Sequence, residues 1–198
     1  MLAFSDGVFA IAMTLLVVGI TVPTIQDTDD VGELADALND LVPNFVSFFI
    51  SFAVIGRYWA AHHQAFSNLA VVDRGLIGIN LIYLAFIAFL PFPTALLGSF
   101  FENPLAIVLY AVTVSIVSGM EVVEFRHAYR KGLLERQPPE DVYRWGVLVS
   151  LSPLAFFILS LPVAFVSTGL AAGCWFLAVP WQAVTNRWKP ENADQYLG

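Results

Sequence analysis

Six apolar runs divide this sequence, and each is long enough to cross a membrane as a helix. A hydrocarbon core of about 30 Å needs roughly 20 apolar residues in helical conformation. Hydrophobic residues make up 58% of the 198 residues and charged residues only 13%, whereas soluble domains are about 45–50% apolar. The sequence therefore predicts an all-α, multi-pass membrane protein with one domain over 1–198 and spans at about 4–22, 44–66, 75–97, 104–125, 144–166 and 168–186.

Charge alternates between the connections of these runs. The connection at 23–43 is acidic and has no Lys or Arg. Eight of the nine basic residues lie in the alternate connections or the C-terminal tail: Arg74, Arg126, Arg130, Lys131, Arg136, Arg144, Arg187 and Lys189. Because Lys and Arg are enriched in cytoplasmic loops, this pattern predicts that both termini are cytoplasmic, which requires an even number of spans.

The acidic connection contains a short amphipathic pattern at 31–41. Leu34, Leu38 and Leu41 follow helical spacing, and acidic residues occupy the opposite face. Two interpretations stay open. The segment is either a solvated loop or a helix whose negative potential concentrates cations at an entrance.

Several classes of protein are excluded or disfavoured by composition and spacing. A net charge of −7 gives no basic footprint for nucleic acid. The single cysteine, Cys174, forms no intrachain disulfide. His62 and His63 are adjacent, so on a helix they point about 100° apart and do not suit joint chelation of a metal. No G-x-S-x-G or H-E-x-x-H pattern occurs, so we expect no enzyme, no cofactor and no bound metal.

The first apolar run has two distinct helical faces. Ile11, Thr14, Leu15 and Val18 share one stripe at i, i+3, i+4 and i+7. Asp6 lies about 140° away from Ile11 around the helix. Periodicity alone favours a stripe that faces lipid or a partner helix. In a symmetric oligomer, however, the same stripe could surround an axis while Asp6 faces neighbouring helices.

Polar residues of three different runs are expected at one depth near the cytoplasmic side. They are Ser5, Asp6, Trp59, His62, His63 and Asn80. Polar side chains inside a membrane must find partners, so these residues are predicted to form a structural network that holds the first helix against the second and third. Glu121 and Glu124, near the cytoplasmic end of the fourth run, are expected at the membrane interface.

An alternative function uses the same polar residues as titrating groups. A proton-coupled secondary transporter would employ Asp6 with His62 or His63. No inverted repeat or pair of broken helices supports this alternative. A membrane-embedded enzyme that uses one of the histidines is a second alternative, and nothing in the spacing supports it.

Three motifs together resemble those of the transmembrane protein 175 family of potassium channels. They are Phe4-Ser5-Asp6-Gly7 with the following Val-Phe-Ala-Ile-Ala, Tyr58-Trp59 with His62-His63, and Asn80 followed by Leu90-Pro91-Phe92-Pro93-Thr94-Ala95. The resemblance covers roughly the first 100 residues by motif. It implies an all-helical channel in which the first helix of each six-helix unit lines a central pore.

The resemblance also implies an assembly and roles for particular residues. One six-helix unit per chain implies a homotetramer in the cell membrane, embedded in lipid and conducting K⁺ and other monovalent cations passively. Ile11 would form a hydrophobic constriction that acts as the gate, and its part in ion selection stays open. Leu15 and Val18 would line the pore farther outward, and Thr14 would add a layer of hydroxyl groups.

One feature departs from the family pattern. Family members usually have an arginine four residues before the phenylalanine of the first motif, a position that falls just before Met1. That arginine normally joins the network around the aspartate. We expect the native N-terminus to extend upstream.

Overall fold

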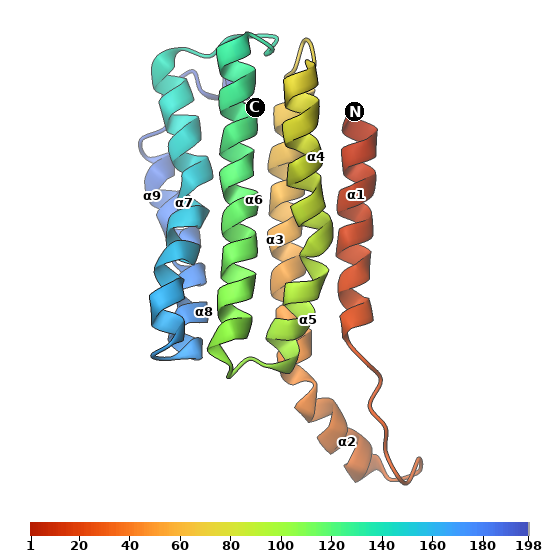
Figure 1. Ribbon diagram of the computed structural model, residues 1–198. Helices are drawn as coiled ribbons and strands as arrows, with labels where there is room; N and C mark the ends of the chain where they lie inside the picture. Colours follow the sequence, from red (N-terminus) through yellow and green to blue (C-terminus); the bar gives the residue numbers. More distant parts are fainter. Residues whose placement is uncertain (198) are drawn as a thin grey trace.

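The computed structural model describes residues 1–197, and within them every regular element is a helix (Figure 1). The elements are α1 (Leu2–Leu15), the 3₁₀ helix η1 (Leu16–Gly19), α2 (Val31–Asp40), α3 (Val42–Ser67), α4 (Arg74–Phe89), α5 (Pro91–Ser99), α6 (Pro104–Lys131), α7 (Glu140–Ala164), α8 (Thr168–Phe176), α9 (Ala178–Asn186) and α10 (Asp194–Leu197). This agrees with the predicted all-α class.

Five segments of the described chain are long and apolar enough to cross a membrane. They are Leu2–Gly19, Val42–Ser67, Arg74–Ser99, Pro104–Lys131 and Glu140–Ala164. The long helices lie side by side in one bundle, with α1 at one edge, α3 to α6 in the middle and α7 to α9 at the other edge (Figure 1). The edge position of α1 leaves much of that helix uncovered in the single chain.

Prolines interrupt two of the predicted spans. The third is divided at Leu90 into α4 and α5, and the sixth is divided at Leu177 into α8 and α9. A proline has no N–H to donate to the carbonyl four residues earlier, so Pro91 and Pro180 each leave a helical carbonyl without its usual partner. The run predicted at 168–186 is therefore two short helices and not one continuous span.

The two ends of the bundle differ in charge and in the segments they hold. Both chain termini lie toward the end that carries the α3–α4 and α6–α7 connections, and α2 projects from the opposite end (Figure 1). At the first end the two connections are joined, because Ala70 N–H donates to the carbonyl of Leu133 over 2.9 Å. At the other end Asp30 caps α2 by accepting from the backbone N–H of Gly32 and Glu33.

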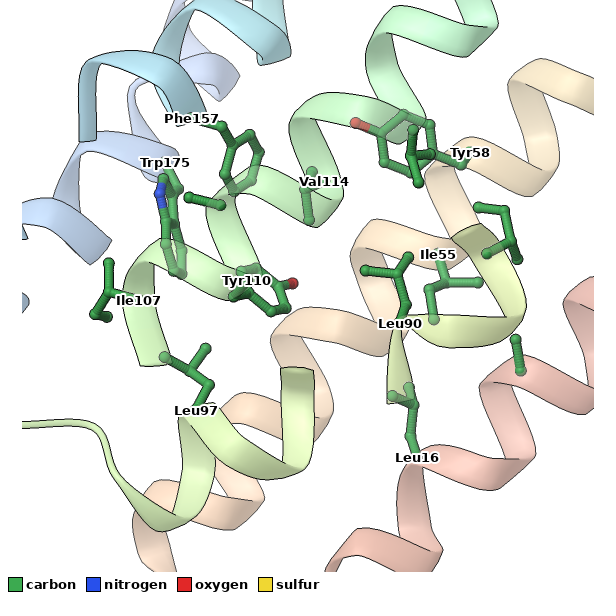
Figure 2. Packing of buried hydrophobic residues seen from close by; sticks show 14 of the residues in the cluster. Leu16, Ile55, Tyr58, Leu90, Leu97, Ile107, Tyr110, Val114, Phe157 and Trp175 are labelled. Atoms are coloured by element: carbon green, nitrogen blue, oxygen red, sulfur yellow. The ribbon is translucent and has the colours of Figure 1, made fainter. Parts of the chain in front are cut away.

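The main hydrophobic core runs through the middle of the bundle (Figure 2). It includes Ile55 of α3, Tyr110 and Val114 of α6, and Phe157 of α7. Helix α1 contributes only one face to this core, through Phe9, Ala12 and, just beyond the helix, Leu16. Burial of this face fixes the rotation of α1 about its own axis.

Candidate functional site

The α1–η1 segment presents its two faces to different surroundings. Phe9 is 0% and Ala12 1% exposed, because this face packs on α3 and α4. On the opposite face Ile11 is 61%, Leu15 45% and Val18 70% exposed. This row of large aliphatic side chains on the surface of the single chain is available for contact with lipid, with another protein chain or with an aqueous path.

Thr14 belongs to the exposed face but directs its proton back to its own helix. Its Oγ1 donates to the carbonyl of Ile11 over 2.9 Å. This local bond satisfies the donor inside the membrane and leaves the hydroxyl oxygen free to accept. Thr14 can therefore offer an acceptor oxygen, and not a donor, to anything that passes the stripe.

The C-terminal end of this segment, at Gly19, is held by a close approach to α5. A Cβ atom on Gly19 would lie 2.8 Å from Cβ of Ala95. Only glycine lets the backbone of η1 come this near to α5. The segment is thus fixed at its outer end by packing of backbone against a neighbouring helix.

The N-terminal end of α1 is held by Asp6. The indole Nε1 of Trp59 donates to Asp6 Oδ1 over 2.8 Å. Nδ1 of His63 lies 3.2 Å from the same oxygen. Because both partners project from α3, one carboxylate oxygen ties α1 to two successive turns of that helix.

A second set of polar contacts lies deeper and reaches α4. His62 Nε2 lies 2.8 Å from Asn80 Oδ1, and Asn80 Nδ2 donates to Ser5 Oγ over 3.2 Å. Ser5 and Asn80 are 0% exposed and His62 is 2% exposed. The imidazole is stacked between the rings of Phe66 and Tyr83. These contacts orient His62 within the bundle.

The six polar residues singled out from the sequence therefore fall into two separate groups. Ser5 and Asp6 are neighbours in the chain, yet Ser5 bonds toward Asn80 and Asp6 bonds toward Trp59. His62 and His63 likewise diverge, one toward α4 and the other toward α1. Among residues 1–197, no group of three or more His, Cys, Asp or Glu side chains could hold a metal ion.

The half of the bundle nearer to α2 contains a chain of hydroxyl groups that the sequence motifs do not indicate. Ser51 Oγ donates to the hydroxyl of Tyr110 over 3.0 Å, and Thr94 Oγ1 donates to Ser51 Oγ over 2.9 Å. This chain links α3, α5 and α6 inside the core. Its signal in the sequence is the helical spacing of Ser47, Ser51 and Tyr58, which all lie on the buried face of α3.

The bundle of apolar helices and its intramembrane polar contacts define an integral, multi-pass membrane protein. Residues 1–91 match the family model described as endosomal/lysosomal potassium channel TMEM175. A protein of Chamaesiphon minutus named a potassium channel is 35% identical over 182 residues, with 89% of each chain covered. The chain belongs to the TMEM175 family, whose members are ion channels and not enzymes.

Two further comparisons agree with this assignment. A protein of Streptomyces collinus named a potassium channel is 41% identical over 136 residues, a match that covers 67% of this chain and 65% of that protein. A crystal structure titled a lysosomal potassium-selective channel TMEM175 homolog from Chamaesiphon minutus superimposes with a TM-score of 0.79 at 31% identity. That match covers 93% of this chain and 96% of the other.

Proposed function

We propose that this protein is a passive, potassium-conducting channel in which four copies arrange the α1–η1 segment around a central axis. The observation that carries the proposal is the division of this segment into two faces. One face is fixed to α3 and α4 by Phe9, Ala12 and the Asp6 contacts. The other leaves Ile11 61% exposed in a single subunit. Membership of a family of potassium channels supports the pore function.

In this arrangement four Ile11 side chains form the narrowest ring. A ring of aliphatic side chains resists wetting when it is narrow, so it closes the path to ions until the helices rotate or move apart. Leu15 and Val18 line the path farther outward. Thr14 contributes a layer of acceptor oxygens, which suits a cation that has shed part of its water. Conduction down a gradient requires no cofactor.

The proposed topology has six crossings and both termini in the cytoplasm. It treats α8 and α9 as one interrupted sixth crossing within a single domain, 1–198. The support is the charge pattern, because Arg74, Arg130 and Arg187 belong to the end of the bundle that holds the termini. On the external side, the acidic helix α2 would raise the local concentration of K⁺ and other monovalent cations.

The decisive experiment measures potassium efflux from liposomes that contain the purified protein. Ile11→Ala should increase the flux or reduce the preference for K⁺ over Na⁺, because a smaller side chain widens and wets the ring. Ile158→Ala is the matched control, since Ile158 on α7 is also exposed, at 48%, but lies at the far edge of the bundle. The control should conduct like wild type.

Two results would contradict the channel. One is the absence of passive flux in the wild type. The other is unchanged flux in Ile11→Ala together with complete loss in Asp6→Asn, which favours a proton-coupled carrier that uses Asp6 with His62 or His63. A pH-sensitive dye inside the liposomes separates these cases, because a carrier must move protons in fixed proportion to potassium.

A further inference from the structure

A cavity of about 340 Å³ lies near the end of the bundle that holds the chain termini, away from the exposed face of α1. Its walls come from α3, α6, α7 and α9. It adjoins a more apolar cavity of about 490 Å³, and the two share Arg57, Val149 and Gln182. Both cavity volumes fall within the range of about 300–1,000 Å³ that is typical of sites for small molecules.

The cavity wall contains a buried carboxylate with one oxygen that lacks a hydrogen-bond partner. Glu124 is 6% exposed, and its Oε1 has no hydrogen-bond partner within residues 1–197. Glu121, one turn earlier on α6, has a side chain that is 13% exposed. A buried, unpaired carboxylate is strongly unfavourable unless a cation or a donor meets it. The sequence predicts both residues at the depth of the membrane interface, and in the fold both line this cavity.

The charges around the cavity do not balance. Arg57 Nη1 lies 3.7 Å from Glu121 Oε2, and Ser150 Oγ donates to Glu121 Oε1 over 3.4 Å. Arg57 therefore compensates Glu121, and no cationic side chain is paired with Glu124 in the part of the chain that the structure describes. The local set of two carboxylates and one guanidinium favours a ligand with one positive charge.

The rest of the lining combines aromatic and aliphatic side chains with the polar residues His62, Gln64, Asn68 and Gln182. Phe66, Phe125 and Trp145 line the cavity together with Leu69 and Leu134. Aromatic faces attract organic cations, and aliphatic walls cover an apolar substituent. A divalent metal ion is disfavoured, because Ca²⁺ and Mg²⁺ prefer several carboxylate ligands and one of the two carboxylates here is already paired with Arg57.

We infer that this cavity is a binding site for a small organic ammonium ion that carries an apolar substituent. The ammonium group donates to the carboxylate of Glu124, and the substituent packs between Phe125 and Trp145. The site is separate from the proposed pore, so binding can be measured without any ion flux. Its success or failure is therefore independent of the channel function.

The experiment titrates phenethylammonium chloride into the purified protein in detergent and follows the heat of binding, after subtraction of a titration into micelles alone. The neutral analogue 2-phenylethanol and the anionic analogue 3-phenylpropanoate have the same ring and a similar length. We expect saturable binding of the ammonium ion and at least about tenfold weaker binding of both analogues, since one lost charged contact is worth about 1.4 kcal/mol or more.

Two variants locate the site. Glu124→Gln should weaken phenethylammonium binding at least about tenfold, whereas Glu102→Gln, in the exposed α5–α6 turn, should bind like wild type. Ala61→Trp keeps both carboxylates but fills the cavity from α3, and it should weaken binding to a similar degree.

Any of the following results would overturn the inference. The first is the absence of saturable binding to the wild type, as expected when a neighbouring subunit covers the cavity. The second is equal affinity for 2-phenylethanol, which reduces the site to an apolar hollow. The third is unchanged binding in folded Glu124→Gln, which indicates a protonated, uncharged carboxyl. If Glu124→Gln does not fold, unchanged binding in Ala61→Trp overturns the inference.

Discussion

The indole N–H of Trp59 donates to Oδ1 of Asp6 over 2.8 Å and joins α3 to the N-terminal end of α1. Asp6 and Ile11 lie about 140° apart around the same helix. The bond therefore holds the polar edge of α1 toward its own subunit while the Ile11 stripe faces outward. In the proposed channel, the contacts that fix the helix are therefore separate from the residues that would line the pore.

Removal of the Trp59 donor should loosen α1 without disturbing the aromatic packing. In Trp59→Phe, the carboxylate of Asp6 loses its shortest bond, and we expect a loss of about 1 kcal/mol and a fall in Tm of about 2–4 °C. The side chain of Asp6 is 33% exposed, which keeps the effect at the low end of the range for charged hydrogen bonds. Thermal unfolding in detergent measures it.

The matched control for this variant is Trp188→Phe. Trp188 lies in the C-terminal tail and is 58% exposed. An equal fall in Tm for both variants would show that the bond to Asp6 contributes nothing specific.

Asn80 should be less tolerant of change than Asp6, because its partners are fully buried. Asn80→Leu leaves Ser5 Oγ and His62 Nε2 without their partner in a dry site. Each unsatisfied buried group costs about 1–3 kcal/mol, so we expect a loss of roughly 2–4 kcal/mol and poor yield of assembled protein. Asn192→Leu, at an exposed position of the tail, is the control, and size-exclusion profiles compare the two.

Close packing of α5 on α3 predicts opposite effects for two glycine-to-alanine changes. A Cβ on Gly98 would lie 2.9 Å from Cα of Asn44, so Gly98→Ala must displace backbone and should lower Tm. A Cβ on Gly119 meets nothing within 4 Å. Gly119→Ala should therefore leave Tm unchanged or raise it, since alanine favours a helix by up to about 1 kcal/mol. Equal Tm values would contradict the packing of α5 on α3.

Sequence periodicity predicts the parts of this fold that depend on local spacing. Hydropathy identifies the membrane-length runs, and a period of about 3.6 residues is enough to separate Ile11 from Asp6 around the helix. The common depth of Asp6, Trp59 and Asn80 follows from the alternation of charged connections. The predicted boundaries of α2 are also close, because 31–41 is expected and Val31–Asp40 is observed.

Contacts that depend on the rotation of one helix against another are not predictable in this way. Adjacent residues such as Ser5 and Asp6 bond to different helices, and no spacing rule decides which neighbour each one meets. The position of Glu124 in the sequence indicates its depth near the membrane interface but not its direction, so the burial of its side chain in the bundle could not be predicted. Pro180 predicts an interruption of the last apolar run, but hydropathy does not show that the run divides at Leu177 into two helices.

A contact at the end of the bundle that holds the chain termini should make the stability of the protein depend on pH. Asp73, between α3 and α4, accepts from the backbone N–H of Leu76 over 2.7 Å and lies 3.0 Å from Nε2 of His127 on α6. The Leu76 N–H, and to a lesser extent His127, hold the pKa of the Asp73 carboxyl below its usual value. The folded protein thus binds a proton at Asp73 less readily than the unfolded chain does.

The sign of the pH effect follows from this difference. The stabilisation from Asp73 is complete above the unfolded pKa of about 4 and is lost as the pH falls through the lower folded value. Tm of the wild type should therefore fall between pH 5 and pH 3. Asp73→Asn keeps an N-cap acceptor for α4 but has no titrating group, so its Tm should fall less over the same interval.

Acid sensitivity should remain in part in Asp73→Asn. The backbone N–H groups of Gln26 and Asp27 similarly lower the pKa of Glu33, which the variant retains. Asp40→Asn, on the exposed end of α2, is the control and should follow the wild type across the whole pH series. If Asp73→Asn and Asp40→Asn both lose Tm in parallel with the wild type, Asp73 does not link α4 to α6, and the acid response arises elsewhere.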